Sequence, residues 1–208
     1  GILDADLNGP SIPRMLGVAG KRFLYDENGA RPPEGPLGIK VAAMSFVADP
    51  TGPLRWKGPM DLTPVWLGMM EAGVIREFLS DTVWGELDSL LFDLPPGAAA
   101  DKPPAIANFI PDLHGALVVT TGSAVALEVV RRSMLYARDL GIPILGLVEN
   151  MSGLFAGDAG ALAREMKTSV LARIPLDKDL AQSLDTGVPL PEGHPVSRQF
   201  LDLARALR

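Results

Sequence analysis

Residues 116–149 read ALVVTTGSAVALEVVRRSMLYARDLGIPILGLVE, and this stretch decides the fold class. Its two ends, 116–121 and 144–149, are short runs that are mostly apolar and do not alternate with polar residues. Such runs are typical of parallel strands that are covered on both faces. The stretch therefore predicts two buried strands with a connection long enough for a helix.

The segment between the two runs has the pattern of an amphipathic helix. Ser123 can cap its start, and Gly141 followed by Pro143 ends it. One face carries the apolar residues Leu127, Val130, Met134 and Ala137. Strand, helix and strand in this order predict a right-handed βαβ unit.

Three more apolar runs, 39–46, 89–93 and 169–174, extend this pattern along the chain. We therefore expect an α/β fold with three layers, in which helices cover a doubly wound, mainly parallel sheet. Residues 60–70 look like an insertion ahead of an amphipathic helix near residues 73–79.

Two of the predicted strands end in acidic residues. The run 90–97 places Asp93 at a strand tip ahead of a Pro-Pro-Gly turn, and the run 1–6 ends in Asp4 and Asp6. Ligands of such sheets bind at the carboxyl ends of the strands, where two carboxylates can hold Mg²⁺ and orient a water molecule. An acid at a solvated strand end is equally common, so the residues alone leave both interpretations open.

Composition narrows the classes of function. The 208 residues suffice for one domain, and 47% hydrophobic with 21% charged residues is typical of a globular protein. A net charge of −6 argues against nucleic-acid binding. No apolar run approaches the roughly 18–20 residues of a membrane span, and no signal segment opens the chain, so we expect a cytoplasmic protein with membrane binding disfavoured.

Cysteine is absent from the chain. This excludes disulfides, thiol nucleophiles and cysteine-ligated iron–sulfur clusters on these residues. With only His114 and His194 present, a histidine-rich metal site is not expected either.

The chain opens at Gly1 directly inside an apolar run. A domain rarely starts within a central strand, because such a strand needs neighbours on both sides. We therefore expect a single domain over residues 1–208 that is truncated at its N-terminus.

Seven segments, taken in order, resemble the Mrp (ApbC-type) ATPases, a family in the ParA/MinD-like branch of the P-loop NTPases. The resemblance runs from about residue 2 to residue 190. The segments are LDADLNGPSIPRMLG (3–17), WKGPM (56–60), WGELD (84–88), DLPPG (93–97), VTT (119–121), VENMSG (148–153) and IPLD (174–177).

The resemblance implies that residues 1–208 form a single nucleotide-binding domain of this family. It also implies a homodimeric, magnesium-dependent ATPase that carries iron–sulfur clusters or delivers them to client proteins. Asp6 matches the switch I acid that positions the attacking water. Asp93 matches the Walker B acid, which orients the magnesium shell. The remaining nucleotide-binding residues implied by the resemblance are Pro96 and Gly97 of the switch II turn, Asn150 against the base, and Pro175 with Leu176 in the loop that flanks the base. Without the family, Asn150 is better explained as a turn residue.

Three departures from the family accompany this resemblance. The glycine-rich phosphate loop with its lysines is expected before Gly1, so the first strand, this loop and the first helix are not among these residues; Gly20-Lys21 is no substitute. The family's Cys-x-x-Cys pair is missing after Gly153, where Leu154 continues towards the next helix. Residues 98–101 read AAAD where the family has Thr-Gly-Asp.

The C-terminal segment carries the apolar stripe Val196, Phe200, Leu203 and Leu207. MinD-type relatives bind membranes with such a helix, but packing against its own domain is the commoner arrangement. Two other functions stay open beside the ATPase: a non-catalytic interaction or scaffold protein, and a MinD/ParA-like positioning ATPase.

Overall fold

The computed structural model describes residues 1–47, 64–96, 102–110 and 112–207. By its internal contacts the chain divides into two compact units. The first comprises residues 1–109 together with 183–189, and the second comprises residues 110–182 together with 190–208.

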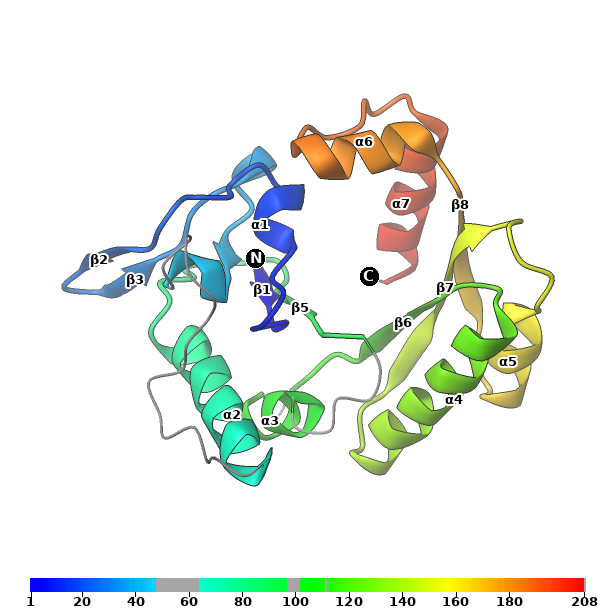
Figure 1. The fold of residues 1–208 in the computed structure, drawn as a ribbon, viewed down its shortest axis with the longest axis horizontal. Coiled ribbons are helices and arrows are strands. Elements are labelled where there is room, and N and C mark those ends of the chain that lie inside the picture. Colours follow the sequence, from blue (N-terminus) through cyan, green and yellow to red (C-terminus); the bar gives the residue numbers. More distant parts are fainter. Residues whose placement is uncertain (48–63, 97–101, 111, 208) are drawn as a thin grey trace. The chain divides into compact units, whose positions relative to one another are not determined.

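The first unit is built on a three-stranded parallel sheet (Figure 1). Strand β1 (Ile2–Asp4) lies in the middle, between β4 (Val41–Ala42) and β5 (Leu91–Asp93). Ile2 stands opposite both Val41 and Leu91 in the register. Leu3, Ala5 and Leu7 are completely buried, as expected for the central strand of such a sheet and the turn that follows it.

Shorter elements surround this sheet. Helix α1 (Ile12–Met15) follows β1, and the antiparallel pair β2 (Leu24–Asp26) and β3 (Gly29–Arg31) forms a hairpin. Gly29 has a φ of +125°, and a Cβ there would lie 2.5 Å from the carbonyl oxygen of Asp81, so this position of the hairpin requires glycine. Helices α2 (Pro64–Ser80) and α3 (Lys102–Phe109) pack against each other.

Two sequence expectations about this unit are corrected. The run 39–46 is not one strand: β4 covers only Val41–Ala42, and a 3₁₀ turn over Met44–Phe46 follows. The turn places the Phe46 ring 5.9 Å from that of Phe23 in an edge-to-face contact, so aromatic packing overrides the apolar pattern.

The helix expected near residues 73–79 begins at Pro64, a residue type favoured in the first turn. Residues 64–70 are therefore helical and not part of an insertion, whereas residues 60–63 lie outside the described residues.

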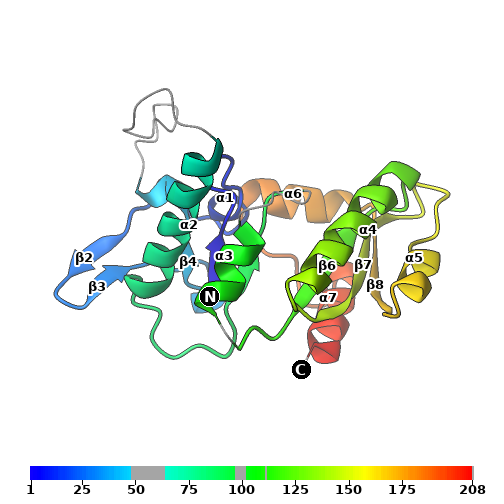
Figure 2. The ribbon, with the colours of Figure 1, turned by 90° about the horizontal axis from the view of Figure 1, so that it is seen from below.

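The second unit contains a parallel sheet with helices on both faces (Figures 1 and 2). Its strand order is β6 (Ala116–Thr120), β7 (Ile144–Ser152), β8 (Val170–Pro175). Helices α4 (Ala124–Asp139) and α5 (Ala159–Glu165) cover one face. Helix α7 (Pro195–Ala206) covers the other, and α6 (Lys178–Thr186) follows β8. The expected three-layer, doubly wound parallel architecture is confirmed.

Two apolar clusters hold these layers together. One joins Leu147 of β7 to Met134 of α4 and Leu162 of α5. The other joins Val148 of β7 and Ile174 of β8 to Val196 and Leu203 of α7. Neighbouring residues Leu147 and Val148 thus face opposite layers, as the pleat of a strand requires.

The helix predicted from Ser123 is present, with Met134 fully buried and Leu127 and Val130 packed against the same cluster.

Candidate functional site

Asp4, Asp6 and Asp93 lie at the carboxyl ends of the neighbouring strands β1 and β5. Asp4 stands opposite Asp93 in the register, and the N–H of Ala5 donates to the carbonyl oxygen of Asp93 at 2.8 Å. The structure therefore brings together the two strand tips that the sequence singled out, within a single sheet.

Asp4 is completely buried, with an exposed fraction of 0%. Its Oδ1 accepts from the N–H of Asp6 at 3.1 Å, and its Oδ2 accepts from the N–H of Ile12 at 3.0 Å. Burial raises the pKa of Asp4 from 3.8 to about 6; the two hydrogen bonds oppose this shift, and the nearby charge of Asp93 adds to it. One carboxylate thus fixes both ends of the turn between β1 and α1.

Asp6 lies on that turn and is partly exposed. Its Oδ1 accepts from the N–H groups of Asn8 at 3.3 Å and of Gly9 at 3.0 Å. These contacts hold the carboxylate in a defined position next to Asp93, which suits a residue that must orient a water molecule.

Asp93 ends β5 with part of its surface open to solvent. Burial, and then the negative charge of Asp6, raise the pKa of Asp93 above its ordinary value. Two carboxylates placed this close together repel each other and attract a divalent cation, which removes the repulsion between them. The donor set, carboxylate oxygens at a strand end, is the one that Mg²⁺ prefers.

Sequence reasoning missed one neighbour of this site. Glu71 of α2 is buried, and its Oε1 accepts from Nδ2 of Asn8 at 3.4 Å. A buried acid within an otherwise apolar helical run is the signal that could have pointed to it. Pro96 follows β5 on the surface, while Gly97 and residues 98–101 lie outside the described residues.

Asn150, Pro175 and Leu176 form a second group, at the carboxyl ends of β7 and β8 in the other unit. Asn150 stands opposite Ile174, Ser152 stands opposite Pro175, and Leu176 is exposed beyond the strand end. The Oδ1 of Asn150 accepts from the N–H of Met151 at 2.9 Å, as in a residue that closes a turn. The three predicted base-binding residues are thus neighbours within their unit.

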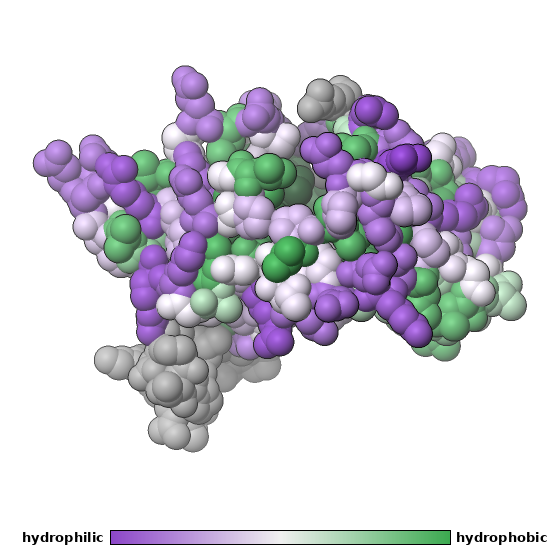
Figure 3. Space-filling model, turned by 90° about the horizontal axis from the view of Figure 1, so that it is seen from above, coloured by the Kyte–Doolittle hydropathy of each residue, from purple (hydrophilic) through white to green (hydrophobic). Residues whose placement is uncertain are grey.

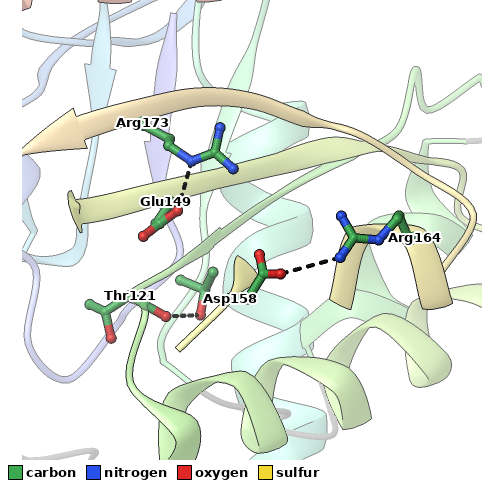
Figure 4. A network of polar contacts seen from close by, with 6 residues as sticks. Thr121, Glu149, Asp158, Arg164 and Arg173 are labelled. Atoms are coloured by element: carbon green, nitrogen blue, oxygen red, sulfur yellow. Dashed lines mark hydrogen bonds and ion pairs between the residues drawn. The ribbon is translucent and has the colours of Figure 1, made fainter. Parts of the chain in front are cut away.

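A polar network that sequence reasoning missed surrounds the same strand ends (Figure 4). Glu149 is buried, and its Oε2 accepts from Nε of Arg173, its register partner on β8, at 3.1 Å. Asp158, before α5, pairs with Arg164 at 3.2 Å. The pair of Glu149 with Arg173 joins β7 to β8. The loop that replaces the expected Cys-x-x-Cys segment is held instead by Asp158 and by the N–H of Gly157, which donates to the carbonyl oxygen of Gly122.

No helix among the described residues is both long and apolar enough to cross a membrane. On the face drawn in Figure 3, hydrophobic residues form separate patches among hydrophilic ones.

Parallel strands covered by helices, with acids at the tips of β1 and β5, are the arrangement that the resemblance to P-loop NTPases of the MinD/ParA type leads one to expect. Comparison with protein-family models agrees: the model described as ParA, NUBPL iron-transfer P-loop NTPase, matches residues 1–208. The chain belongs to this family.

Curated relatives point to the same branch. The iron–sulfur cluster carrier protein of Saccharolobus solfataricus is 38% identical over 98% of this chain and 71% of the relative. That of Methanocaldococcus jannaschii is 39% identical over 91% of this chain and 66% of the relative. A cytosolic Fe-S cluster assembly factor, the NUBP2 homolog of Trichoplax adhaerens, is 37% identical over all of this chain and 81% of the relative.

Solved structures show the same fold. A nucleotide-binding protein from Archaeoglobus fulgidus, in complex with ADP, has a TM-score of 0.72 and 32% identity over 93% of this chain and 81% of that one. The septum site-determining protein MinD from Pyrococcus horikoshii, complexed with Mg-ADP, has a TM-score of 0.62. Its identity is 18% over 98% of this chain and 80% of that one, so it supports the fold alone.

Proposed function

We propose that this protein is a magnesium-dependent ATPase that takes part in the assembly or delivery of iron–sulfur clusters. The observation that carries the proposal is the group Asp4, Asp6 and Asp93, held at the tips of two adjacent parallel strands. The names of the carrier and assembly-factor relatives support the cluster-related role. They favour it over a positioning role, because the MinD structure supports the fold alone.

In this proposal Asp4, Asp6 and Asp93 each have a separate role. Asp93 would hold the water shell of Mg²⁺, an ion that would supply positive charge to neutralise the phosphates. Asp6 positions the water molecule that attacks the γ-phosphate. Asp4 holds the backbone N–H of Asp6 and thereby sets the direction of its carboxylate.

The adenine base would be bound by Asn150, Pro175 and Leu176. An Asn amide can donate to and accept from an adenine edge at once, and the exposed Leu176 offers an apolar surface to the ring. Pro96 and Gly97 would form the turn that approaches the γ-phosphate. The ADP-bound relative from Archaeoglobus fulgidus supports nucleotide binding by this fold.

Most of the phosphate affinity would come from a glycine-rich loop with lysines. Among the described residues β5 pairs only with β1, and Leu91 on it is exposed. We propose that the strand leading to this loop pairs with the open edge of β5, as part of one nucleotide-binding domain.

An iron–sulfur cluster would be a substrate that the protein carries, and not its resident cofactor. The 208 residues contain no cysteine, so its thiolate ligands would be supplied by other segments or by client proteins. We further propose a homodimer in the cytoplasm, which the family resemblance and the name of the cytosolic relative support; no nucleic-acid or membrane partner is proposed.

The test is nucleotide binding and hydrolysis by the full-length protein from its own gene, with and without Mg²⁺. We expect Mg²⁺ to strengthen ATP binding and to be required for phosphate release. A protein that binds client proteins but shows no magnesium-dependent ATP binding would instead be a scaffold, and the proposal would be wrong.

A further inference from the structure

Three metal-ligating side chains gather where two helices of the second unit begin. Asp177 immediately precedes α6, Asp179 lies in its first turn, and His194 is the N-cap of α7. One ligand atom of each lies within 4.8 Å of the others. The proposed nucleotide chemistry does not use any of the three.

The distances within this His–Asp–Asp cluster suit an ion between its members. His194 Nε2 lies 3.5 Å from Oδ2 of Asp179 and 4.0 Å from Oδ2 of Asp177. Two atoms bound to the same ion at about 2.1 Å are at most about 4.2 Å apart. Both separations therefore allow shared coordination, whereas they are long for direct hydrogen bonds.

Two of the ligands are held in place before any ion binds. The side chains of His194 and Asp177 are only 17% and 24% exposed. Asp177 Oδ1 accepts from the N–H of Leu180 at 2.7 Å, which leaves Oδ2 on the side of His194. Asp179 is 72% exposed, so it can swing to complete the site while water fills the open positions.

We propose that Asp177, Asp179 and His194 bind a divalent first-row transition metal ion of the zinc class. An imidazole nitrogen with two carboxylate oxygens suits such ions, whereas Mg²⁺ takes oxygen ligands and keeps several waters. The bound ion would link the beginning of α6 to the beginning of α7, because its ligands come from both. The site does not depend on the ATPase assignment.

Metal binding changes the protonation of His194 in a defined way. Nδ1 accepts from the N–H of Val196 at 3.3 Å, so in the neutral ring the proton is on Nε2. A metal on Nε2 displaces that proton, and Nδ1 takes one up, so the neutral ring releases none overall. The long hydrogen bond from Val196 is lost in exchange for the metal bond.

Zinc chloride titrated into chelator-treated protein and followed by calorimetry tests the site. We expect one Zn²⁺ per chain, no comparable binding of Mg²⁺, and a weakening of about tenfold or more in His194→Asn. Asn at an N-cap can still accept from the N–H of Val196, so this variant removes the metal ligand and keeps the cap. Nitrogen NMR of the imidazole should show the proton moving from Nε2 to Nδ1 as zinc is added.

Asp179→Asn is the second variant, because its exposed side chain lies outside the core, and it too should lose affinity. His114→Asn is the matched control and should bind zinc like the parent. Absence of stoichiometric zinc binding would overturn the proposal, as would unchanged affinity in both His194→Asn and Asp179→Asn.

Discussion

Asp4 shows how one buried side chain can set a pH dependence. Its pKa is about 6 in the folded protein against 3.8 ordinarily, so the folded state holds the proton more tightly than the unfolded state. The stability that this contributes is present in full below about pH 4 and is lost as the pH rises to about 6. The shift corresponds to roughly 3 kcal/mol.

We therefore predict that Asp4→Asn flattens the fall in stability between about pH 4 and pH 6. Urea unfolding midpoints measured across this range check it. Asp93→Asn is the comparison variant and should flatten the fall less, because burial, the largest cause of the Asp4 shift, remains when the charge of Asp93 is removed. A slope that survives unchanged in Asp4→Asn would show that another group is responsible.

Asp6 and Asp93 should differ in what they do for ATP. A carboxylate that only orients water acts in the transition state, so Asp6→Ala should leave ATP affinity nearly intact and lower hydrolysis by roughly 10²-fold or more. Asp93→Ala should also weaken the magnesium-dependent part of binding.

Nucleotide affinity of the two variants, measured with and without Mg²⁺ in the full-length protein, separates these roles. Hydrolysis by Asp6→Ala at the parent rate would contradict its assignment to switch I.

At the scale of elements, helix α7 is a structural part of the second unit. Val196 and Leu203 are buried in the cluster with Val148 and Ile174. Leu201, on the same helix, is 49% exposed. Val196, Leu203 and Leu207 of the apolar stripe thus pack on the helix's own sheet, as the commoner of the two sequence interpretations expected, whereas Phe200 is 44% exposed.

Leu203→Ala should lower the free energy of unfolding by about 2–4 kcal/mol, because it leaves a cavity between α7 and the sheet. Leu201→Ala is the matched control on the same helix and should change it by less than about 0.5 kcal/mol. Chemical denaturation measures both. Equal effects of the two substitutions would show that α7 does not pack as described.

At the scale of the whole molecule, phosphate binding and base binding are separable. The 208-residue polypeptide keeps Asn150 and Pro175 but contains no glycine-rich loop with signature lysines. We predict that this polypeptide binds ATP with a Kd no tighter than about 1 mM. Calorimetry with MgATP checks this, and micromolar affinity would mean that another loop cradles the phosphates.

The same polypeptide should assemble no iron–sulfur cluster, because thiolates are the usual ligands and it has none. Anaerobic reconstitution followed by desalting should leave no absorbance above background near 400 nm. A stable brown species in stoichiometric amount would require ligation by histidine or carboxylate and would contradict the prediction.

The sequence by itself determined the fold class and the strand tips. Continuous apolar runs such as 144–149 are typical of strands covered on both sides, and the helix between Ser123 and Gly141 follows from its spacing. The acids Asp6 and Asp93 could be located because a strand end exposes the residue that follows the apolar run.

Only the tertiary structure decided how these acids differ. Asp4 and Asp6 have similar sequence surroundings, yet Asp4 is buried with a pKa of about 6, and Asp6 is partly exposed on the turn. The sequence also did not indicate three further groups: Glu71, the pair of Glu149 with Arg173, and the cluster of Asp177, Asp179 and His194. Burial and pairing depend on which distant segments pack together, and the local pattern of a single sequence carries no record of that packing.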